Sequence, residues 1–217
     1  MSIQSTVLNF FLKKFVKNTK PSPDEYSYQD MRDLMNDSFE MGEKNFIEKL
    51  IIKSTFANRR SSIKSTEIVL DGIRTLKITR DDSQKEKCIL YFHGGGYIAG
   101  SPETHLNLLK EIYNNSKITI YAIDYSLSPE SKFPLALNEA VRSYTALRNL
   151  GYQANNIIIG GDSAGGNLSL VCTLKLQENN QELPSKLFLL SPWTDLTASG
   201  KSIESNSISD PYLSYDD

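Results

Sequence analysis

The sequence predicts an α/β protein with a doubly wound, mostly parallel β-sheet. Three apolar runs, the second with a single threonine in it, are typical of strands buried on both faces, as in the interior of a parallel sheet. These runs are Cys88–Phe92, Ile118–Ile123 and Ile157–Ile159. A helical pattern with short flanking connections separates each run from the next, and this alternation favours right-handed parallel crossovers.

The predicted elements begin with a β-hairpin. Residues 66–70 and 73–79 have strand patterns and flank Asp71-Gly72, a turn dipeptide. After the hairpin we expect, in chain order, a strand at 88–92, a helix at about 102–114, a strand at 118–123, a helix at 134–150, a strand at 157–159, a helix at 163–177 and a strand at 186–190. Residues 199–210 are rich in serine and are expected to form a loop.

The first 60 residues differ in pattern from this alternating core. Residues 1–20 carry apolar side chains at helical spacing with lysines between them, and residues 24–58 also have a helical pattern. We expect a helical section that packs on its own domain. The alternative is a basic amphipathic helix at residues 1–20 that lies on a membrane.

Composition and charge narrow the class of protein. The chain has 217 residues, a net charge of −2 and 39% hydrophobic residues, which suits one domain with a sizeable core. This charge provides no attraction to nucleic acid. No apolar stretch is long enough for a transmembrane helix and no signal peptide is recognisable, so the cytoplasm is the expected compartment. Cys88 and Cys172 lie in apolar elements and are expected to be buried thiols, in preference to a disulfide or a metal site.

A serine motif follows the strand at Ile157–Ile159. Gly161-Asp162-Ser163-Ala164-Gly165 fits the pattern G-x-S-x-G. A strand that turns sharply into a helix strains the backbone at the serine, and glycines two residues to either side avoid a clash. The helix also places its N-terminal N–H groups and positive dipole end beneath the serine. Ser163 is therefore the expected nucleophile, although the pentapeptide alone also fits an ordinary glycine-rich turn.

A serine nucleophile needs N–H donors for the oxyanion that forms on its substrate. His93-Gly94-Gly95-Gly96 directly follows the strand at 88–92, and glycines let the backbone approach a substrate closely. We expect the N–H groups of Gly94, Gly95 and Ala164 to form the oxyanion hole. His93 and Gly96 are expected to support this loop. Taken alone, the segment also fits a flexible turn.

With these motifs the sequence resembles the hormone-sensitive-lipase-like esterases of the α/β-hydrolase fold. Five motifs carry the resemblance and occur in the order of that family: Tyr91–Tyr97 (YFHGGGY), Asp124–Glu130 (DYSLSPE), Phe133-Pro134, Gly161–Asn167 (GDSAGGN) and Ser191–Asp195 (SPWTD). The resemblance implies a hydrolase that acts on small-molecule carboxylic esters, with no cofactor and no metal. It also implies that residues 1–60 form an N-terminal helical cap segment and residues 61–217 the α/β-hydrolase core.

The chain departs from this family after Ser163. In this fold the catalytic residues follow the order Ser, Asp or Glu, His, but none of the 217 − 163 = 54 residues after Ser163 is a histidine. The resemblance places His93 in the oxyanion loop, and we expect His105 to be a surface or packing residue. Four downstream aspartates match no catalytic position of the family: Asp195, Asp210, Asp216 and Asp217.

We therefore expect the catalytic Asp and His to be absent from these residues, and the last strands and helix of the fold to be missing, as in a C-terminally truncated family member. Ester hydrolysis by these residues alone is then expected to be weak or absent. Two other classes stay open. One is a non-catalytic hydrolase-fold protein that binds a small ligand or a partner, and the other is an interaction protein anchored by the N-terminal basic helix.

Overall fold

The computed structural model describes residues 27, 29–30, 32–33, 35–37 and 63–206. The chain divides into two units, Asp30–Trp193 on the one hand and Met1–Gln29 with Thr194–Asp217 on the other. The helical section expected for residues 1–60 lies almost wholly outside the described residues, although the described positions from 29 to 37 are helical. The boundary between a cap segment and a core near residue 60 stays a prediction.

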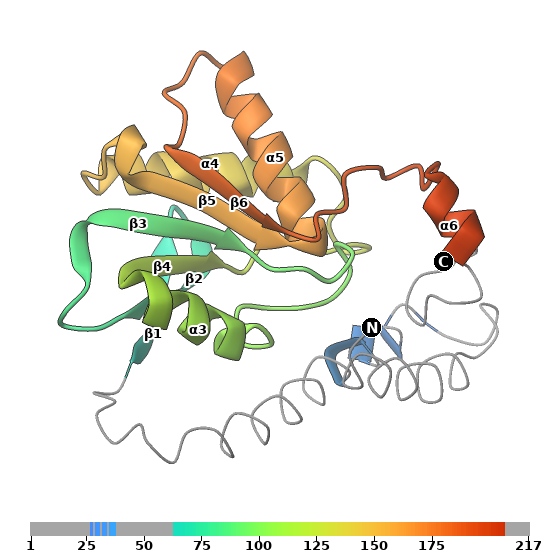
Figure 1. Ribbon diagram of the computed structural model, residues 1–217, viewed down its shortest axis with the longest axis horizontal. Helices are drawn as coiled ribbons and strands as arrows, with labels where there is room; N and C mark the ends of the chain where they lie inside the picture. The colour runs from blue at the N-terminus through green and yellow to red at the C-terminus, as the bar shows by residue number, and fades with distance from the viewer. Residues whose placement is uncertain (1–26, 28, 31, 34, 38–62, 207–217) are drawn as a thin grey trace. The chain divides into compact units, whose positions relative to one another are not determined.

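Six strands in the described part of Asp30–Trp193 form one sheet. They are β1 (Lys64–Leu70), β2 (Ile73–Thr79), β3 (Gln84–Phe92), β4 (Ile118–Ile123), β5 (Ile157–Asp162) and β6 (Lys186–Leu190). The sheet order is β1-β2-β4-β3-β5-β6 (Figure 1). The β1–β2 and β2–β4 pairs are antiparallel, and the other three pairs are parallel. The predicted hairpin and the mostly parallel sheet are confirmed.

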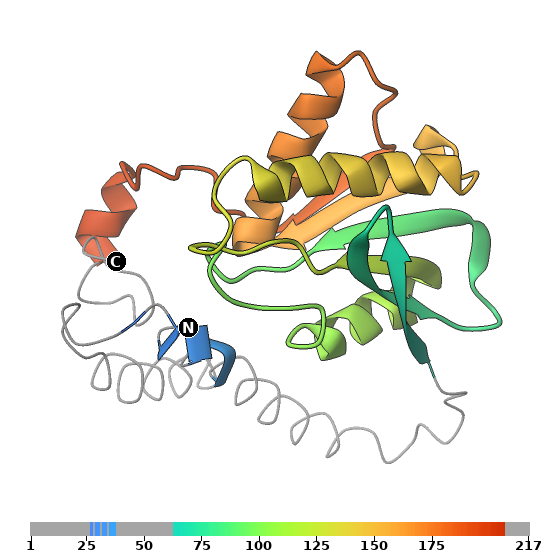
Figure 2. The same ribbon diagram turned by 180° about the vertical axis from the view of Figure 1, so that it is seen from behind.

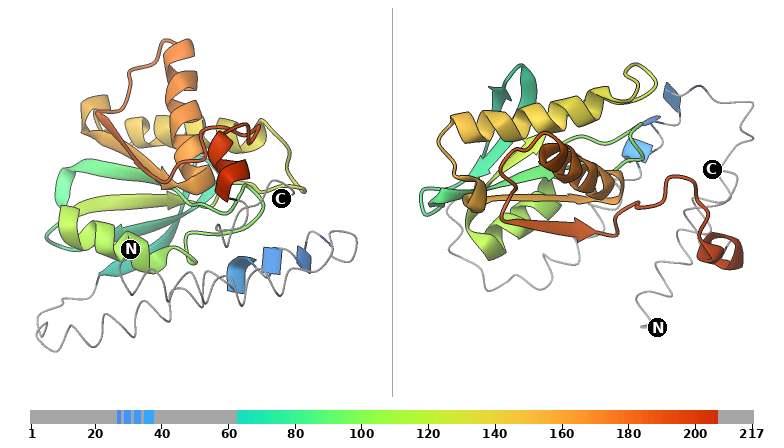
Figure 3. Two further views of the ribbon diagram at one scale, coloured as in Figure 1. Left: turned by 45° about the vertical axis from the view of Figure 1, so that its right-hand side comes forward. Right: turned by 90° about the horizontal axis from the view of Figure 1, so that it is seen from above.

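Three helices follow the strands as a doubly wound fold requires. They are α3 (Leu106–Ser116), α4 (Leu135–Asn149) and α5 (Ser163–Glu178), and a short 3₁₀ helix, η3 (Ala154–Asn156), leads into β5. Helix α3 covers one face of the sheet, and α4 and α5 cover the other (Figures 1 and 3). From behind, the β1–β2 hairpin is seen at one end of the sheet, below α4 (Figure 2).

Alternate residues of β3 enter the two cores on opposite faces of the sheet. Ile89 and Tyr91 pack with Leu109 of α3, whereas Leu90 and Phe92 belong to the core formed with α4 and α5. Successive side chains of a strand point to opposite faces, so a strand covered on both sides needs an unbroken apolar run. This requirement explains why the apolar runs in the sequence located the central strands.

Both cysteines lie in the core beneath α4 and α5. Cys88 and Cys172 are free thiols with no exposed surface, so the prediction of buried thiols is confirmed. Burial raises the pKa of each thiol to about 12. Both groups therefore stay protonated and unreactive at neutral pH.

Several expected boundaries differ from the structure. Strand β3 begins at Gln84, before the expected residue 88, and β5 continues to Asp162, beyond the expected residue 159. The helix expected from residue 102 begins at Leu106, because Ser101 and Thr104 close a turn: the N–H of Ser101 donates to Thr104 Oγ1 and the N–H of Thr104 to Ser101 Oγ. The loop expected for residues 199–210 contains a short helix, α6 (Lys201–Asn206), in the second unit. Serines are neutral in helices, so their number alone does not exclude a short helix.

Replacement of Leu90 tests the core beneath α4 and α5. Leu90 has no exposed surface, and Leu90→Ala is expected to lower the free energy of unfolding by about 3 kcal/mol because it leaves a cavity. Leu174→Ala is the matched control, since Leu174 lies on α5 with 61% of its surface exposed, and it is expected to cost about 0.5 kcal/mol or less. Urea unfolding gives both values, and equal losses would contradict this description of the core.

Candidate active site

Ser163 lies at the sharp turn between β5 and α5. Strand β5 ends at Asp162 and α5 begins at Ser163, whose φ is 50°. This left-handed backbone conformation costs free energy for any residue with a β-carbon. Ser163 is nevertheless exposed, between the half-buried Asp162 and the buried Ala164. The structure therefore has the strained, accessible serine that the motif predicted.

The two glycines of the motif allow α5 to approach the sheet. A β-carbon on Gly165 would collide with the carbonyl oxygen of Phe92 and lie 2.5 Å from that of His93. A β-carbon on Gly161 would collide with the Gly165 carbonyl oxygen and lie 2.5 Å from Phe92 O. All of these carbonyl oxygens are backbone atoms and cannot rotate away. A side chain at either glycine would therefore displace the helix from the sheet.

The loop that follows β3 forms a tight turn around Gly95. The N–H groups of Ile98 and Ala99 donate to Gly95 O at 3.0 and 2.9 Å. Gly95 and Gly96 have φ values of 121° and 63°, which favour glycine. Among the described residues we find no acceptor for the N–H groups of Gly95 and Ala164. These two groups remain candidates for the oxyanion hole.

The structure gives Gly94 a different role from the one expected. Its N–H donates to Asp162 Oδ1 at 3.0 Å, so this donor already has a partner and is not free for a substrate. Burial alone would raise the pKa of the Asp162 carboxyl, but hydrogen bonds from His105, Tyr91 and Gly94 outweigh burial and lower it. Asp162 is therefore an anion that binds the oxyanion loop.

His93 supports this loop from within the core. Its ring stacks on Tyr125 with the ring centroids 4.3 Å apart, and the Tyr125 hydroxyl donates to His93 O at 2.7 Å. The Nδ1 atom of His93 lies 2.7 Å from Gly94 O, which fits a donating Nδ1–H. Its buried Nε2 has no hydrogen-bond partner in the described structure. Burial lowers the pKa of His93 to about 4, so the ring is neutral at pH 7.

The Ser-Pro-Trp motif after β6 supports the serine turn from the other side. The N–H of Trp193 donates to Ser163 O at 2.9 Å. Pro192 packs against Gly166, where an added β-carbon would lie 2.8 Å from the Pro192 β-carbon. The serine motif, the glycine-rich loop and the Ser-Pro-Trp motif thus meet at one junction of the fold.

His105 and the aspartates after Ser163 are the remaining candidate groups from the sequence. His105 is 5% exposed and precedes α3 as its N-cap residue, so it is a packing residue and not a surface residue. The Asp195 carboxylate accepts hydrogen bonds from Ser199 and Thr197, which lower its pKa to about 2. The three remaining downstream aspartates lie outside the described residues: Asp210, Asp216 and Asp217.

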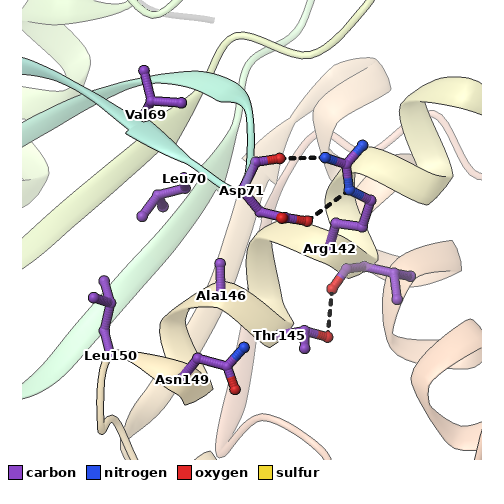
Figure 4. Close-up of a pocket in the computed structure, with 9 residues that line it drawn as sticks. Val69, Leu70, Asp71, Arg142, Thr145, Ala146, Asn149 and Leu150 are labelled. Carbon is purple, nitrogen blue, oxygen red and sulfur yellow. Dashed lines mark hydrogen bonds and ion pairs between the residues drawn. The ribbon is translucent and has the colours of Figure 1, made fainter.

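A separate groove lies between β1 and α4. It has a volume of about 410 Å³ and includes Val69, Leu150 and the Asp71–Arg142 ion pair, in which Arg142 Nε lies 2.7 Å from Asp71 Oδ2 (Figure 4). It contains no residue of the serine turn or of the oxyanion loop.

In the part of the chain that the structure describes, no cluster of three metal-ligating side chains is found. No described helix is both long and apolar enough to span a lipid bilayer.

A mostly parallel sheet that presents a strained serine between a strand and a helix is the arrangement of the α/β-hydrolases. The model of a family described as alpha/beta hydrolase fold matches residues 89–217, and the chain belongs to this family.

Relatives of the chain are esterases and lipases, which confirms the resemblance read from the motifs. An esterase of Acinetobacter venetianus is 34% identical over 153 residues, which cover 70% of this chain and 50% of that protein. Hormone-sensitive lipase of Mus musculus is 34% identical over 129 residues, which cover 58% of this chain and 17% of that protein. The crystal structure of a hormone-sensitive lipase from a metagenome library has a TM-score of 0.81 at 32% identity and covers 100% of this chain and 66% of that one. The chain thus spans at most about half the length of these two curated relatives.

Substitutions at Ser163 separate its backbone strain from its hydroxyl group. Ser163→Gly and Ser163→Ala both remove the hydroxyl, but only glycine relieves the cost of φ = 50°. We expect Ser163→Gly to be more stable than Ser163→Ala by about 1 kcal/mol, after the entropy that glycine adds to the unfolded chain is subtracted. Urea unfolding of the two variants measures this difference, and a less stable glycine variant would contradict the strained turn.

The buried His93 predicts a pH-dependent stability. Its folded pKa of about 4 lies below its ordinary value of 6.5, so the unfolded chain binds the proton more readily between these values. The contribution of His93 is complete above pH 6.5 and is lost as the pH falls toward 4. We expect a loss of about 2 kcal/mol between pH 7 and pH 4.5 in urea unfolding.

The matched comparison for this pH effect is His93→Asn, which removes the titrating ring. This variant is expected to be less stable at pH 7 because the stacking on Tyr125 is lost. Its stability should also fall less steeply between pH 7 and pH 4.5 than that of the wild type. Parallel curves for the two proteins would show that His93 is not buried in its neutral form.

Proposed function

We propose that this chain carries the nucleophile and the oxyanion donors of a serine carboxylic-ester hydrolase. Ser163 Oγ attacks the ester carbonyl carbon, the alcohol leaves, and water then hydrolyses the acyl-serine ester. The N–H groups of Gly95 and Ala164 stabilise the oxyanion. Gly94, which the sequence analysis included among the donors, holds the loop through Asp162 instead.

The observation that carries this proposal is the strained, exposed Ser163 at the N-terminus of α5. A binding protein has no need of a serine in a costly backbone conformation, whereas a nucleophile gains access to substrate from it. The first N–H groups of α5 have no partners within the helix, and the positive end of the helix dipole favours a developing negative charge.

The names of the relatives support an ester substrate. They include esterases, an acetyl-hydrolase of Streptomyces hygroscopicus and hormone-sensitive lipases. We propose a small-molecule ester as the substrate and a reaction that needs no cofactor, since serine, base and oxyanion donors suffice for acyl transfer.

The general base is the part that these residues do not supply. His93 is enclosed in the core, and His105 contacts Asp162 with its Nε2 atom. The 54 residues after Ser163 contain no histidine. A polypeptide of these 217 residues should therefore show only the residual catalysis of an oxyanion hole and a bound substrate, about 10³–10⁴ over water.

Hydrolysis of p-nitrophenyl butyrate with added imidazole tests this function. Without imidazole, we expect the wild-type chain and Ser163→Ala to differ by less than about tenfold. Imidazole can act as the missing base, so it is expected to accelerate the wild type in a saturable way and to leave Ser163→Ala at the imidazole background. Mass spectrometry should then find the butyryl group on Ser163.

Two outcomes would contradict parts of this proposal. An equal response of the two proteins to imidazole would remove Ser163 as the nucleophile and favour a non-catalytic, ligand-binding protein. Fast Ser163-dependent turnover without imidazole would mean that a base lies within these residues after all.

A further inference from the structure

Asp162 does not use its side chain in the way its position favours. It is the N-cap residue of α5, where aspartate commonly accepts hydrogen bonds from the first N–H groups of the helix. The structure shows no such capping bond. The carboxylate therefore leaves the N–H groups beside Ser163 available for a substrate.

The carboxylate instead joins three other segments of the fold. Its Oδ1 accepts hydrogen bonds from the Tyr91 hydroxyl at 2.7 Å and from the Gly94 N–H at 3.0 Å. Its Oδ2 lies 3.3 Å from Nε2 of His105. The side chain of Asp162 is 21% exposed and that of His105 is 5% exposed, so water competes weakly for these contacts.

Gly94 makes this arrangement possible because it lacks a side chain. A β-carbon on Gly94 would collide with Oδ2 of Asp162, so only glycine lets the carboxylate reach the loop backbone. Asp162 is also covalently bonded to Ser163. One residue therefore connects the nucleophile directly to the loop that carries Gly95.

We infer that Asp162 is a positioning residue that sets the oxyanion loop relative to Ser163, with Tyr91 and His105 holding its carboxylate in place. The part of this inference that concerns catalysis rests on the proposed function. The geometric part, in which the carboxylate orients the Gly94–Gly95 backbone, does not depend on any activity.

His105 determines where the second carboxylate oxygen lies. Its Nδ1 atom is 2.9 Å from Thr104 Oγ1 and 3.2 Å from Ser101 O, so these contacts orient the ring from the turn before α3. Nε2 donates to Asp162 in both the neutral Nε2–H form and the doubly protonated form. His105, 57 residues before Asp162 in the sequence, thus fixes the carboxylate of the residue next to Ser163.

Asp162→Asn is the decisive variant. The amide oxygen can still accept a hydrogen bond from Gly94, but it carries no charge, and the amide NH₂ group opposes the Nε2–H of His105. The Gly94 amide proton is expected to shift upfield in proton–nitrogen NMR spectra and to exchange with water about fivefold to tenfold faster. The chain has only 12 glycines, which makes these signals tractable.

Asp124→Asn is the matched control. Asp124 directly follows β4, and its carboxylate pairs with Arg74 at 2.8 Å. Among the described residues it makes no hydrogen bond to residues 93–96. This variant is expected to leave the Gly94 and Gly95 amide signals unchanged. If Asp162→Asn does not fold, Tyr91→Phe removes one donor at nearly constant volume and should shift the same signals to a smaller extent.

Kinetics in the imidazole-supplied reaction test the catalytic part. Asp162→Asn is expected to lower kcat by about tenfold to a hundredfold, since a displaced oxyanion donor acts mainly in the transition state, while KM changes by less than about threefold. His105→Leu should lower kcat in the same direction by a smaller factor. A merely structural role would lower the melting temperature and leave kcat unchanged.

The outcomes separate this inference from the proposed function. Unchanged Gly94 and Gly95 signals in Asp162→Asn, or equal shifts in Asp124→Asn, would overturn the positioning role. Absence of any Ser163-dependent turnover would overturn the proposed function, and the amide signals would still decide whether Asp162 orients the loop. Shifted signals with an unchanged kcat would overturn the link between loop position and catalysis.

Discussion

The contact between the first turn of α5 and the end of β3 is the constraint on which the candidate site depends. Gly165 lies against the carbonyl groups of Phe92 and His93, and no side chain fits between these two backbones. The helix is held there because Leu168 and Cys172, further along α5, are buried in the core. This packing over-determines the turn, and the strained Ser163 persists because relief of its strain would cost the core its contacts.

Two neighbouring titratable groups at this junction differ in charge because their surroundings differ. His93 is buried against Tyr125, its Nε2 has no hydrogen-bond partner among the described residues, and the ring stays neutral. Asp162 is partly buried but accepts hydrogen bonds from three donors, which keep it anionic. The neutral ring supports the loop by packing and by its hydrogen bond to Gly94 O, and the charged group ties the loop to the serine turn.

The chain belongs to the α/β-hydrolase family, and the strand-to-helix turn at Ser163 and the glycine-rich loop after β3 both lie within the described residues. The chain spans about half of the Acinetobacter esterase. In the proposed reaction the general base takes the serine proton in the step in which the nucleophile attacks, and added imidazole can take the place of that base.

The sequence by itself determined the order of strands and helices from β1 to β6, because strands covered on both faces leave unbroken apolar runs. It also determined that Ser163 lies at a sharp strand-to-helix turn, because such a strained turn needs glycines at fixed local spacing. Only the tertiary structure decided that Gly94 binds Asp162 and that His105 reaches the same carboxylate. These pairs are 68 and 57 residues apart, and no local pattern encodes such contacts. They arise when parallel strands bring their carboxyl ends to one edge of the sheet.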